Sequence, residues 1–186
     1  RDSSKVRTVT FKGNYTKQLN NNHQLKTGGE FVYSKLDLKY GSQNEFLPLG
    51  NYWSFMDVNP YRLSVFAQDK LEYKGFVAIL GLNLDVLNPN GDWYVIENYD
   101  DDFFSSNYTA AAEETFETVT LDPQVQLSPR LALSHPITET SKLYFNYGHY
   151  QQMPIAQDLY RVRRGFSEEV LTIGDPTLPM ANTIAY

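Results

Sequence analysis

Apolar and polar side chains alternate along several long segments of this chain. In the segment 61–73, which reads YRLSVFAQDKLEY, the apolar residues share one parity and nearly all of the polar residues share the other. Only Phe66 and Asp69 break the alternation. Because successive side chains of a β-strand point to opposite faces of the sheet, this pattern predicts a strand with one apolar face and one polar face.

Five more segments of this kind give three predicted hairpins in series. The predicted strands begin near residues 9, 24, 61, 76, 124 and 142. Within each hairpin the connection is a short turn, and these turns fall at residues 18–23, 72–75 and 136–141. Between hairpins the connections are long and rich in Pro, Asn, Asp and Ser, and they run over residues 41–60, 87–123 and 151–179.

The asymmetry between short turns and long loops indicates the class of fold. Unstructured loops longer than about a dozen residues are uncommon in compact soluble domains. Outer-membrane barrels have short turns on the periplasmic side and longer extracellular loops. We therefore predict an all-β fold, an antiparallel up-and-down meander that is an open part of a transmembrane β-barrel.

The aromatic residues at the strand ends agree with a membrane-spanning length. Tyr61 and Tyr73 lie twelve residues apart on the apolar parity. At about 3.3 Å per residue and a tilt of about 40°, they would be roughly 30 Å apart along the membrane normal, close to the ~25 Å apolar band that aromatic girdles flank. We predict Tyr61, Tyr73 and Phe76 as interfacial aromatic residues.

The remaining apolar residues of the same parity are the predicted lipid-facing set. It consists of Leu63, Val65, Leu80, Leu82, Leu84, Leu131, Leu133 and Phe145. On the opposite parity, we expect Arg62, Gln68, Lys70, Asn83, Asp85, Gln126 and Arg130 to line the water-filled or plug-filled interior.

Composition narrows the class of protein further. The chain has 186 residues, a net charge of -6 and no Cys. The negative charge argues against a nucleic-acid partner, and the lack of Cys excludes disulfides, zinc–cysteine sites and a thiol nucleophile. No uncharged run reaches the ~18 residues of a membrane helix, but barrel strands pair their backbone groups with one another and need no such run.

Three stretches of the chain resemble a known family. They are NPYRLSVFAQDKLEYKGFVAILGLNLDVLNP from Asn59, LSPRLALSHPITETSKLYFNYGHYQQMP from Leu127 and GDPTLPMANTIAY from Gly174. Their residues and their order are similar to the barrel of TonB-dependent outer-membrane receptors, particularly the branch with a carboxypeptidase-regulatory-like amino-terminal domain.

The resemblance implies a 22-stranded barrel in the bacterial outer membrane, closed by a plug. Such a receptor takes up a scarce nutrient, which the sequence does not identify, with energy supplied through the TonB system. The implied partners are outer-membrane lipid, the receptor's own plug domain and the TonB system. We expect residues 1–186 to be a partial barrel of about six full strands and the start of a seventh near Ile184, with the plug domain absent.

Catalytic and metal-binding patterns are weak. His23, His135 and His149 lack any metal-ligand spacing, and Ser128 lacks the flanking glycines of a nucleophile elbow. The acidic run ENYDDD over residues 97–102 could offer oxygen ligands to calcium but does not follow EF-hand spacing. We predict no catalytic residues, no metal site, no cofactor and no enzymatic activity.

The long loops carry the only candidate ligand-binding residues. Aromatic side chains at Trp93, Tyr94, Tyr99, Phe103 and Phe104 could stack on an apolar or sugar-like ligand, although packing against one another within the loop is the more ordinary role for them. Arg161, Arg163 and Arg164 form a positive cluster that could attract an anionic ligand or pair with Glu168 and Glu169 nearby.

One alternative to a transporter is a soluble or surface-attached β-rich carbohydrate-binding module. In a sandwich of that kind, the apolar faces turn inward against each other and strands need only about five or six residues. The strands predicted here are about twice that length. This difference favours the transporter.

Overall fold

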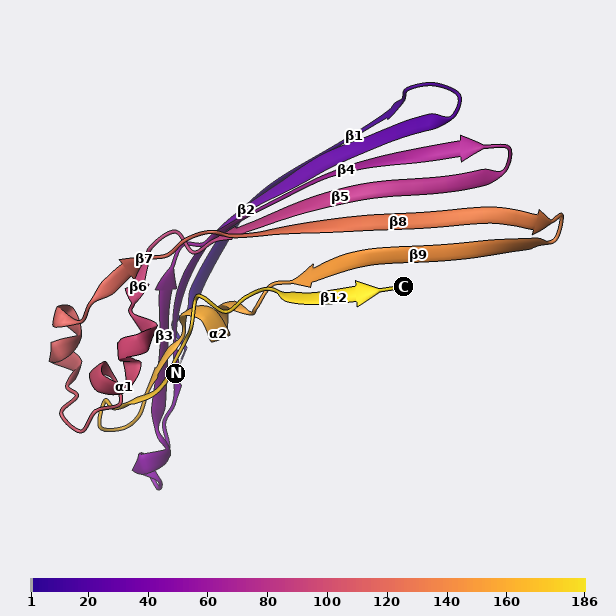
Figure 1. Cartoon of the computed structure of the whole chain (residues 1–186). Coiled ribbons are helices and arrows are strands. Elements are labelled where there is room, and N and C mark those ends of the chain that lie inside the picture. Colours follow the sequence, from indigo (N-terminus) through magenta and orange to yellow (C-terminus); the bar gives the residue numbers. More distant parts are fainter. Residues whose placement is uncertain (1) are drawn as a thin grey trace.

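The computed structural model describes residues 2–186, which form one large antiparallel sheet and a set of loops at one end of it (Figure 1). The large sheet has ten strands: β1 (Lys5–Gln18), β2 (His23–Ser42), β3 (Tyr52–Val58), β4 (Tyr61–Tyr73), β5 (Phe76–Asn88), β8 (Gln124–Thr138), β9 (Ser141–Gln152), β10 (Val162–Arg164), β11 (Val170–Ile173) and β12 (Ala181–Ala185). A second, small sheet pairs β6 (Asp92–Tyr94) with β7 (Thr118–Thr120). The helices are short: α1 (Tyr99–Asp102), α2 (Ala156–Tyr160) and 3₁₀ turns at Pro48–Gly50, Ile96–Asn98 and Ala110–Thr115.

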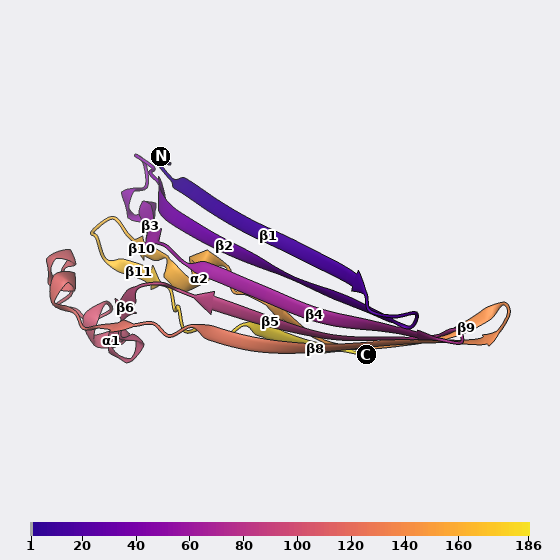
Figure 2. The same cartoon turned by 90° about the horizontal axis from the view of Figure 1, so that it is seen from above.

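The long strands form the predicted meander. They follow one another in chain order as β1, β2, β4, β5, β8, β9 and β12, and every neighbouring pair is antiparallel. The sheet is curved and does not close, with β1 and β12 at opposite edges (Figures 1 and 2). The predicted fold class, an open part of a β-barrel, is therefore confirmed.

The strands β3 and β4 are two parts of one long strand. Both pair with β2 in a single uninterrupted register, in which Val58 lies opposite Leu36 and Tyr61 lies opposite Tyr33. Between the two parts, the Ser34 N–H still donates to the carbonyl oxygen of Pro60 over 3.0 Å, but the reciprocal bond is missing because proline has no N–H to donate. The prediction of a loop over residues 41–60 was therefore wrong for most of that range, and the connection between β2 and β3 spans only residues 43–51.

The last long loop also contains strands that were not predicted. From residue 153 the chain passes through α2 and returns across the sheet, so that β10 pairs with β3 and β11 extends the sheet beyond it. This crossover lies outside the meander. It creates a fork in the sheet, because the part of the strand before Asn59, β3, pairs with β10, whereas the part after Pro60, β4, pairs with β5.

The turn between β4 and β5 is tighter than expected. It consists of Lys74 and Gly75, which both have positive φ, 48° and 84°. Such left-handed pairs form the hairpin turn whose twist matches that of the flanking strands. As a result, Tyr73 and Phe76 lie directly opposite each other as the last pair of the ladder.

The buried core of the described residues lies at the loop end of the sheet. Met56, Leu87, Leu159, Tyr160 and Met180 pack together, supported by Leu36, Leu38, Val58, Trp93, Met153 and Ala156. By the strand register, the β2, β3 and β5 members of this cluster lie on the same face of the sheet as Arg62. The α2 segment therefore packs against the loop end of the polar face, over β2, β3 and the end of β5. Within residues 2–186, no helix has the length and apolar content to cross a membrane.

Candidate functional site

The two faces of the meander differ in chemistry along the central section of its strands. The strand register places all eight predicted lipid-facing residues on one face, which we call the apolar face. These side chains are uncovered to an extent that is unusual for leucines in a folded domain: Leu80 is 59% exposed and Leu82 is 47% exposed. Arg62, Gln68, Lys70, Asn83, Asp85, Gln126 and Arg130 share the opposite, polar face.

The three predicted interfacial aromatics lie at the two ends of the apolar face. Tyr73 and Phe76 flank the short turn. Tyr61 lies at the other end of β4, where its hydroxyl accepts a hydrogen bond from Nδ2 of Asn88 over 2.9 Å. A tyrosine held in this way presents an apolar ring and a polar tip, as aromatic side chains do at a membrane surface.

A ladder of charges crosses four strands on the polar face. Lys12 of β1 donates to Glu30 of β2 over 3.0 Å, and the second oxygen of Glu30 accepts from Arg62 of β4. Asp85 and Asn83 of β5 bond to each other next to it. Lys12, Glu30, Arg62 and Asp85 line a shallow cavity of about 210 Å³. Together they form a hydrogen-bonded polar surface across β1, β2, β4 and β5.

Phe66 breaks the alternation because it fills the space above a glycine. It lies on the polar face, and its ring covers Gly28 of β2, where an added Cβ would lie 2.8 Å from Cε1 of Phe66 and 2.7 Å from the carbonyl oxygen of Gly13. Farther along this face, the ring of Tyr150 lies over Gly148 in the same way, and Arg130 stacks on that ring at 4.9 Å from its centroid. Aromatic rings and charges thus alternate along the polar face.

A cavity of about 230 Å³ lies at the fork in the sheet. Asp57 and Asn59 line it from the β3–β4 strand, and Asn90, Asp92 and Trp93 line it from the chain that follows β5. The amide of Asn90 bridges the fork by donating to the carbonyl oxygen of Asn59 over 3.0 Å. The carbonyl and carboxylate oxygens here could hold a small polyhydroxylated or cationic group.

The aromatic residues predicted to bind a ligand mostly pack on one another. Phe103 is 2% exposed and contacts Tyr94 and Tyr99 edge to face, with ring centroids 4.8 and 5.7 Å apart. Trp93 packs between Tyr94 and Tyr160. Only Phe104, which is 49% exposed, presents its ring to solvent. The cluster therefore stiffens the loop. Of its members, Phe104 exposes its ring to solvent, and Trp93 lines the cavity at the fork.

Tyr99 connects the two longest loops. Nε1 of Trp93 donates to its hydroxyl over 2.6 Å, and the hydroxyl donates in turn to the carbonyl oxygen of Gly174 over 2.8 Å. Burial raises the pKa of Tyr99 to about 12. The phenol therefore remains neutral and keeps its proton for the bond to Gly174 across the physiological pH range.

Arg164 forms a second connection between these loops. Its guanidinium donates to Oε2 of Glu113 over 2.6 Å and to the hydroxyl of Tyr108, which itself bonds to Glu113. Burial, with the Glu113 hydrogen bond as the next cause, raises the pKa of Tyr108 to about 12. The predicted pairing of the arginine cluster with Glu168 or Glu169 is wrong for Arg164, because its carboxylate partner lies in the other loop.

The other two arginines of the predicted cluster differ from Arg164. Arg163 stacks over the ring of Tyr52, with Cζ 3.8 Å from the centroid. Arg161 is partly buried, and its backbone carbonyl accepts from Gly174. The three arginines therefore have separate structural contacts, and a shared anion site at them stays a prediction.

The three histidines lie far apart. His23 bonds to Asp69, His149 bonds to the hydroxyl of Tyr147, and His135 packs near the ring of Phe76. Across the part of the chain that the structure describes, no group of three or more His, Cys, Asp or Glu side chains is arranged to hold a metal ion.

The comparison with protein families agrees with this geometry. The family described as "TonB dependent receptor-like, beta-barrel" matches residues 1–182, which is nearly the whole chain. The chain belongs to this family. TonB-dependent receptors are transporters of the bacterial outer membrane, and they are not enzymes. No curated protein matches the chain.

Sequence reasoning missed several of the residues that shape these surfaces. The ladder from Lys12 to Arg62 requires knowledge of which strands are neighbours, although the alternating parity did place Arg62 on the correct face. The contacts of Arg164 with Tyr108 and Glu113 join residues more than 50 positions apart. No local pattern signals a pairing of that kind.

Proposed function

We propose that this chain forms part of the barrel wall and the extracellular loops of an outer-membrane active transporter that takes up a scarce nutrient with TonB-coupled energy. The observation that carries the proposal is the difference between the two faces. Strands of 12 to 15 residues expose leucines on one face and charged ladders on the other. Lipid is the solvent that such an apolar face requires.

The absence of a covering layer supports the same conclusion. A carbohydrate-binding sandwich would bury the apolar face against a second sheet. Among residues 2–186, the only other sheet is the three-residue pair β6–β7, which belongs to a loop. The leucines of β4, β5 and β8 therefore have no protein layer to cover them, and the soluble module loses its main support.

In this proposal the polar face lines the interior of the barrel. The charges of Lys12, Glu30 and Arg62 would face the plug domain or water, and the segments joined by Tyr99 and Arg164 would surround the extracellular entrance. The ligand remains a nutrient of unidentified class, which would meet the loops before it meets the plug.

Two measurements on the full-length receptor test this proposal. Single spin labels at Leu82→Cys and Asn83→Cys should collide preferentially with oxygen in the lipid and with a water-soluble nickel chelate, respectively. Equal accessibility at both positions would contradict the assignment of the two faces. For uptake, cells lacking the receptor should leave in their medium at least one nutrient that parent cells consume, and a protonophore should abolish that consumption. A medium that is depleted identically by both strains would contradict nutrient uptake.

A further inference from the structure

The cavity at the fork in the sheet is lined by polar groups that have no partner in the chain. It lies between the end of β3 and the chain that follows β5, and Tyr160 of α2 also lines it (Figure 1). Tyr160 is 2% exposed, yet its hydroxyl makes no hydrogen bond among residues 2–186. Oδ1 of Asn59, at the same cavity, is also buried without a partner in this range. Buried polar groups are normally hydrogen-bonded, so two such atoms at one cavity point to a group supplied from outside the chain.

Two carboxylates add hydrogen-bond acceptors at the mouth of the cavity. Asp57 and Asp92 line it and are both exposed. Neither forms an ion pair within the described residues. Oδ1 of Asp92 accepts from Oγ1 of Thr120 over 2.7 Å, which leaves its other oxygen for a ligand. An occupant of the cavity therefore meets acceptors on Asp57, Asn59 and Asp92.

Tyr160 contributes a hydrogen-bond donor to the same cavity. Burial raises the pKa of its phenol to about 12, so the group keeps its proton at physiological pH. A cation can satisfy the carboxylates but cannot accept a hydrogen bond from the phenol. A hydroxyl group donates to one neighbour and accepts from another. The combination of acceptors and a donor therefore favours a ligand rich in hydroxyl groups over an ammonium or a metal ion.

Trp93 supplies apolar surface beside these polar groups. Its Nε1 already donates to the hydroxyl of Tyr99 over 2.6 Å, and its ring meets that of Tyr160 edge to face at 6.0 Å. Trp93 therefore offers carbon surface to the cavity and no further hydrogen bond. A sugar ring has C–H groups on its faces and hydroxyls around its edge, and so matches this lining. The cavity of about 230 Å³ is smaller than the ~300 Å³ at the low end of drug-sized pockets, which limits the occupant to a single ring.

Hydrogen bonds across the fork fix the shape of the cavity. Nδ2 of Asn90 donates to the carbonyl oxygen of Asn59 over 3.0 Å, and the Asn90 N–H donates to Oδ1 of Asn88 over 2.6 Å. The Leu121 N–H donates to the carbonyl oxygen of Gly91 over 3.2 Å. A site that is formed in advance loses little conformational freedom when it binds, so a single ring can be held by few contacts.

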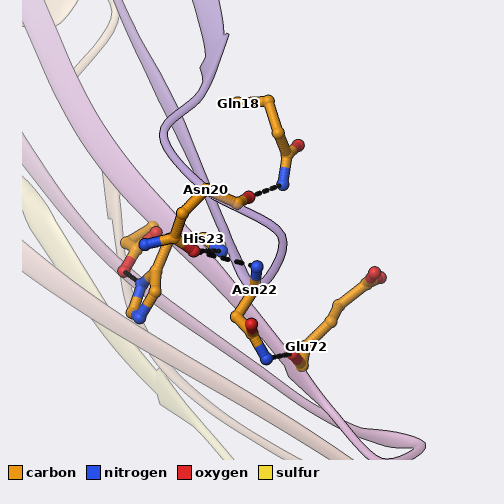
Figure 3. A network of polar contacts seen from close by, with 6 residues as sticks. Gln18, Asn20, Asn22, His23 and Glu72 are labelled. Carbon is orange, nitrogen blue, oxygen red and sulfur yellow. Dashed lines mark hydrogen bonds and ion pairs between the residues drawn. The ribbon is translucent and has the colours of Figure 1, made fainter.

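The short turn between β1 and β2 is polar as well, but its groups are paired. Oδ1 of Asn20 accepts from the backbone N–H groups of Asn22 and His23, each over 2.9 Å. Nδ2 of Asn22 donates to the carbonyl oxygen of Glu72 over 2.7 Å (Figure 3). These side chains shape the turn and tie it to β4. The buried, unpaired groups at the fork are therefore not a general property of polar turns in this chain.

We propose that the fork cavity binds one uncharged sugar ring, which is a unit of the transported nutrient. Asp57 and Asp92 accept hydrogen bonds from its hydroxyls, Tyr160 donates to one of its oxygens, and Trp93 lies against its C–H groups. Asn59 comes just before Tyr61 on the loop side of the strand, so the cavity lies beyond the apolar band, where a water-soluble ligand reaches it. The site rests on the proposed function, because that function places the loop end of the sheet at the extracellular entrance.

Saturation-transfer difference NMR of the full-length receptor in nanodiscs tests the proposal, with the methyl glycosides of glucose, galactose and mannose as probes. At least one glycoside should receive saturation, and neither choline chloride nor calcium chloride should displace it. Tyr160→Phe removes only the donating hydroxyl and should weaken binding about 3- to 10-fold, as expected for one neutral hydrogen bond. Tyr94→Phe is the matched control, because Tyr94 also packs on Trp93 but does not line the cavity, and it should leave binding unchanged.

Three results would overturn the site. They are no saturation transfer to any of the three glycosides, equal binding by the wild-type receptor and Tyr160→Phe, and displacement of the glycoside by choline or calcium. A measurement without sugar adds a further check. A buried hydroxyl without a partner carries a desolvation cost, so backbone hydrogen exchange over residues 156–162 should be no faster in Tyr160→Phe. Faster exchange would show that another part of the receptor bonds to the hydroxyl, and would also overturn the site.

The depletion of nutrients from the medium separates this inference from the proposed function. A receptor that supports protonophore-sensitive depletion but binds no glycoside contradicts only the sugar site. A receptor that binds a glycoside through Tyr160 but supports no depletion contradicts only the proposed uptake.

Discussion

The ring of Phe66 lies directly over Gly28 on the polar face of the sheet. A methyl group at Gly28 would meet the Phe66 ring and the backbone of Gly13. Gly28→Ala should therefore lower the free energy of unfolding of the full-length barrel by about 1 to 3 kcal/mol, the usual cost of overpacking. Reversible urea unfolding in lipid vesicles measures it. Gly13→Ala is the control, because nothing lies within 4 Å of its added Cβ, and an equal loss at both glycines would contradict the steric explanation.

Neighbouring residues of β5 should respond oppositely to a charge. Arg at Leu82 places a guanidinium on the apolar face near the middle of the strand and should cost about 2 to 4 kcal/mol, as charged side chains do at the bilayer midplane. An arginine at Asn83 would point to the polar face, where the Asp85 carboxylate can accept its hydrogen bonds. This substitution should therefore change the free energy of unfolding little. The amount of assembled, heat-modifiable protein in outer membranes reports the difference. If both variants are lost equally, protein covers both faces.

The contact of Arg164 with Glu113 should hold two loops in place. Both side chains are largely buried, so Arg164→Gln leaves a carboxylate without its charged partner. We expect a local loss of about 1 to 3 kcal/mol, less than for a fully buried pair, seen as faster hydrogen exchange over residues 105–116. Glu114→Gln is the control, because this neighbour of Glu113 is exposed. Unchanged exchange in Arg164→Gln would show that the aromatic cluster alone orders the loop.

Alkaline pH should loosen the loops through their buried phenols. The pKa of Tyr99 rises from 10.0 to about 12 on burial. A group with a raised pKa in the folded state stabilises it fully below the unfolded pKa, and this stability is lost as pH rises through the folded value. The loss should therefore develop between pH 10 and about 12. The pKa values of Tyr108 and Tyr160 also rise to about 12. Tyrosinate absorbance after a rapid pH jump should therefore show several late-titrating phenols, and the late absorbance change should be smaller by one phenol in Tyr99→Phe. Identical titrations of the two proteins would refute this assignment.

The meander could be predicted because each long strand carries its own signal. Alternation over 13 residues in β4 and β5 specifies both the strand and the face of every side chain. The segment Tyr52–Val58 carries no comparable pattern, because it lies beyond the apolar band and is ordered by its ladder to β2 and by β10. Its strand conformation depends on partners that are distant in sequence.

The candidate site was predictable only in part for a similar reason. The sequence identified Trp93, Tyr99 and Phe103 as an aromatic cluster, but whether such rings face a ligand or one another depends on the course of the loop. The two exceptions in β4 were visible from the start. Phe66 covers Gly28 and Asp69 meets His23, so each break in the pattern marked a contact with a neighbouring strand that could not be known beforehand.

The single strand that contains both β3 and β4 has a mechanical consequence. Its outer end leads to the loop of residues 43–51, its inner end reaches the short turn, and the 20-residue strand β2 runs alongside both parts without interruption. A force applied to the outer loop by a bound ligand would thus be transmitted along two strands that are hydrogen-bonded to each other over their length. Asn59 and Pro60 are its weakest point, because Pro60 cannot donate a bond to β2 and the neighbouring strand on the other side changes from β5 to β10. Bending would concentrate at this position. The outer part of the sheet, formed by β3, β10 and β11, would then tilt as one unit, while β4 and β5 keep their register.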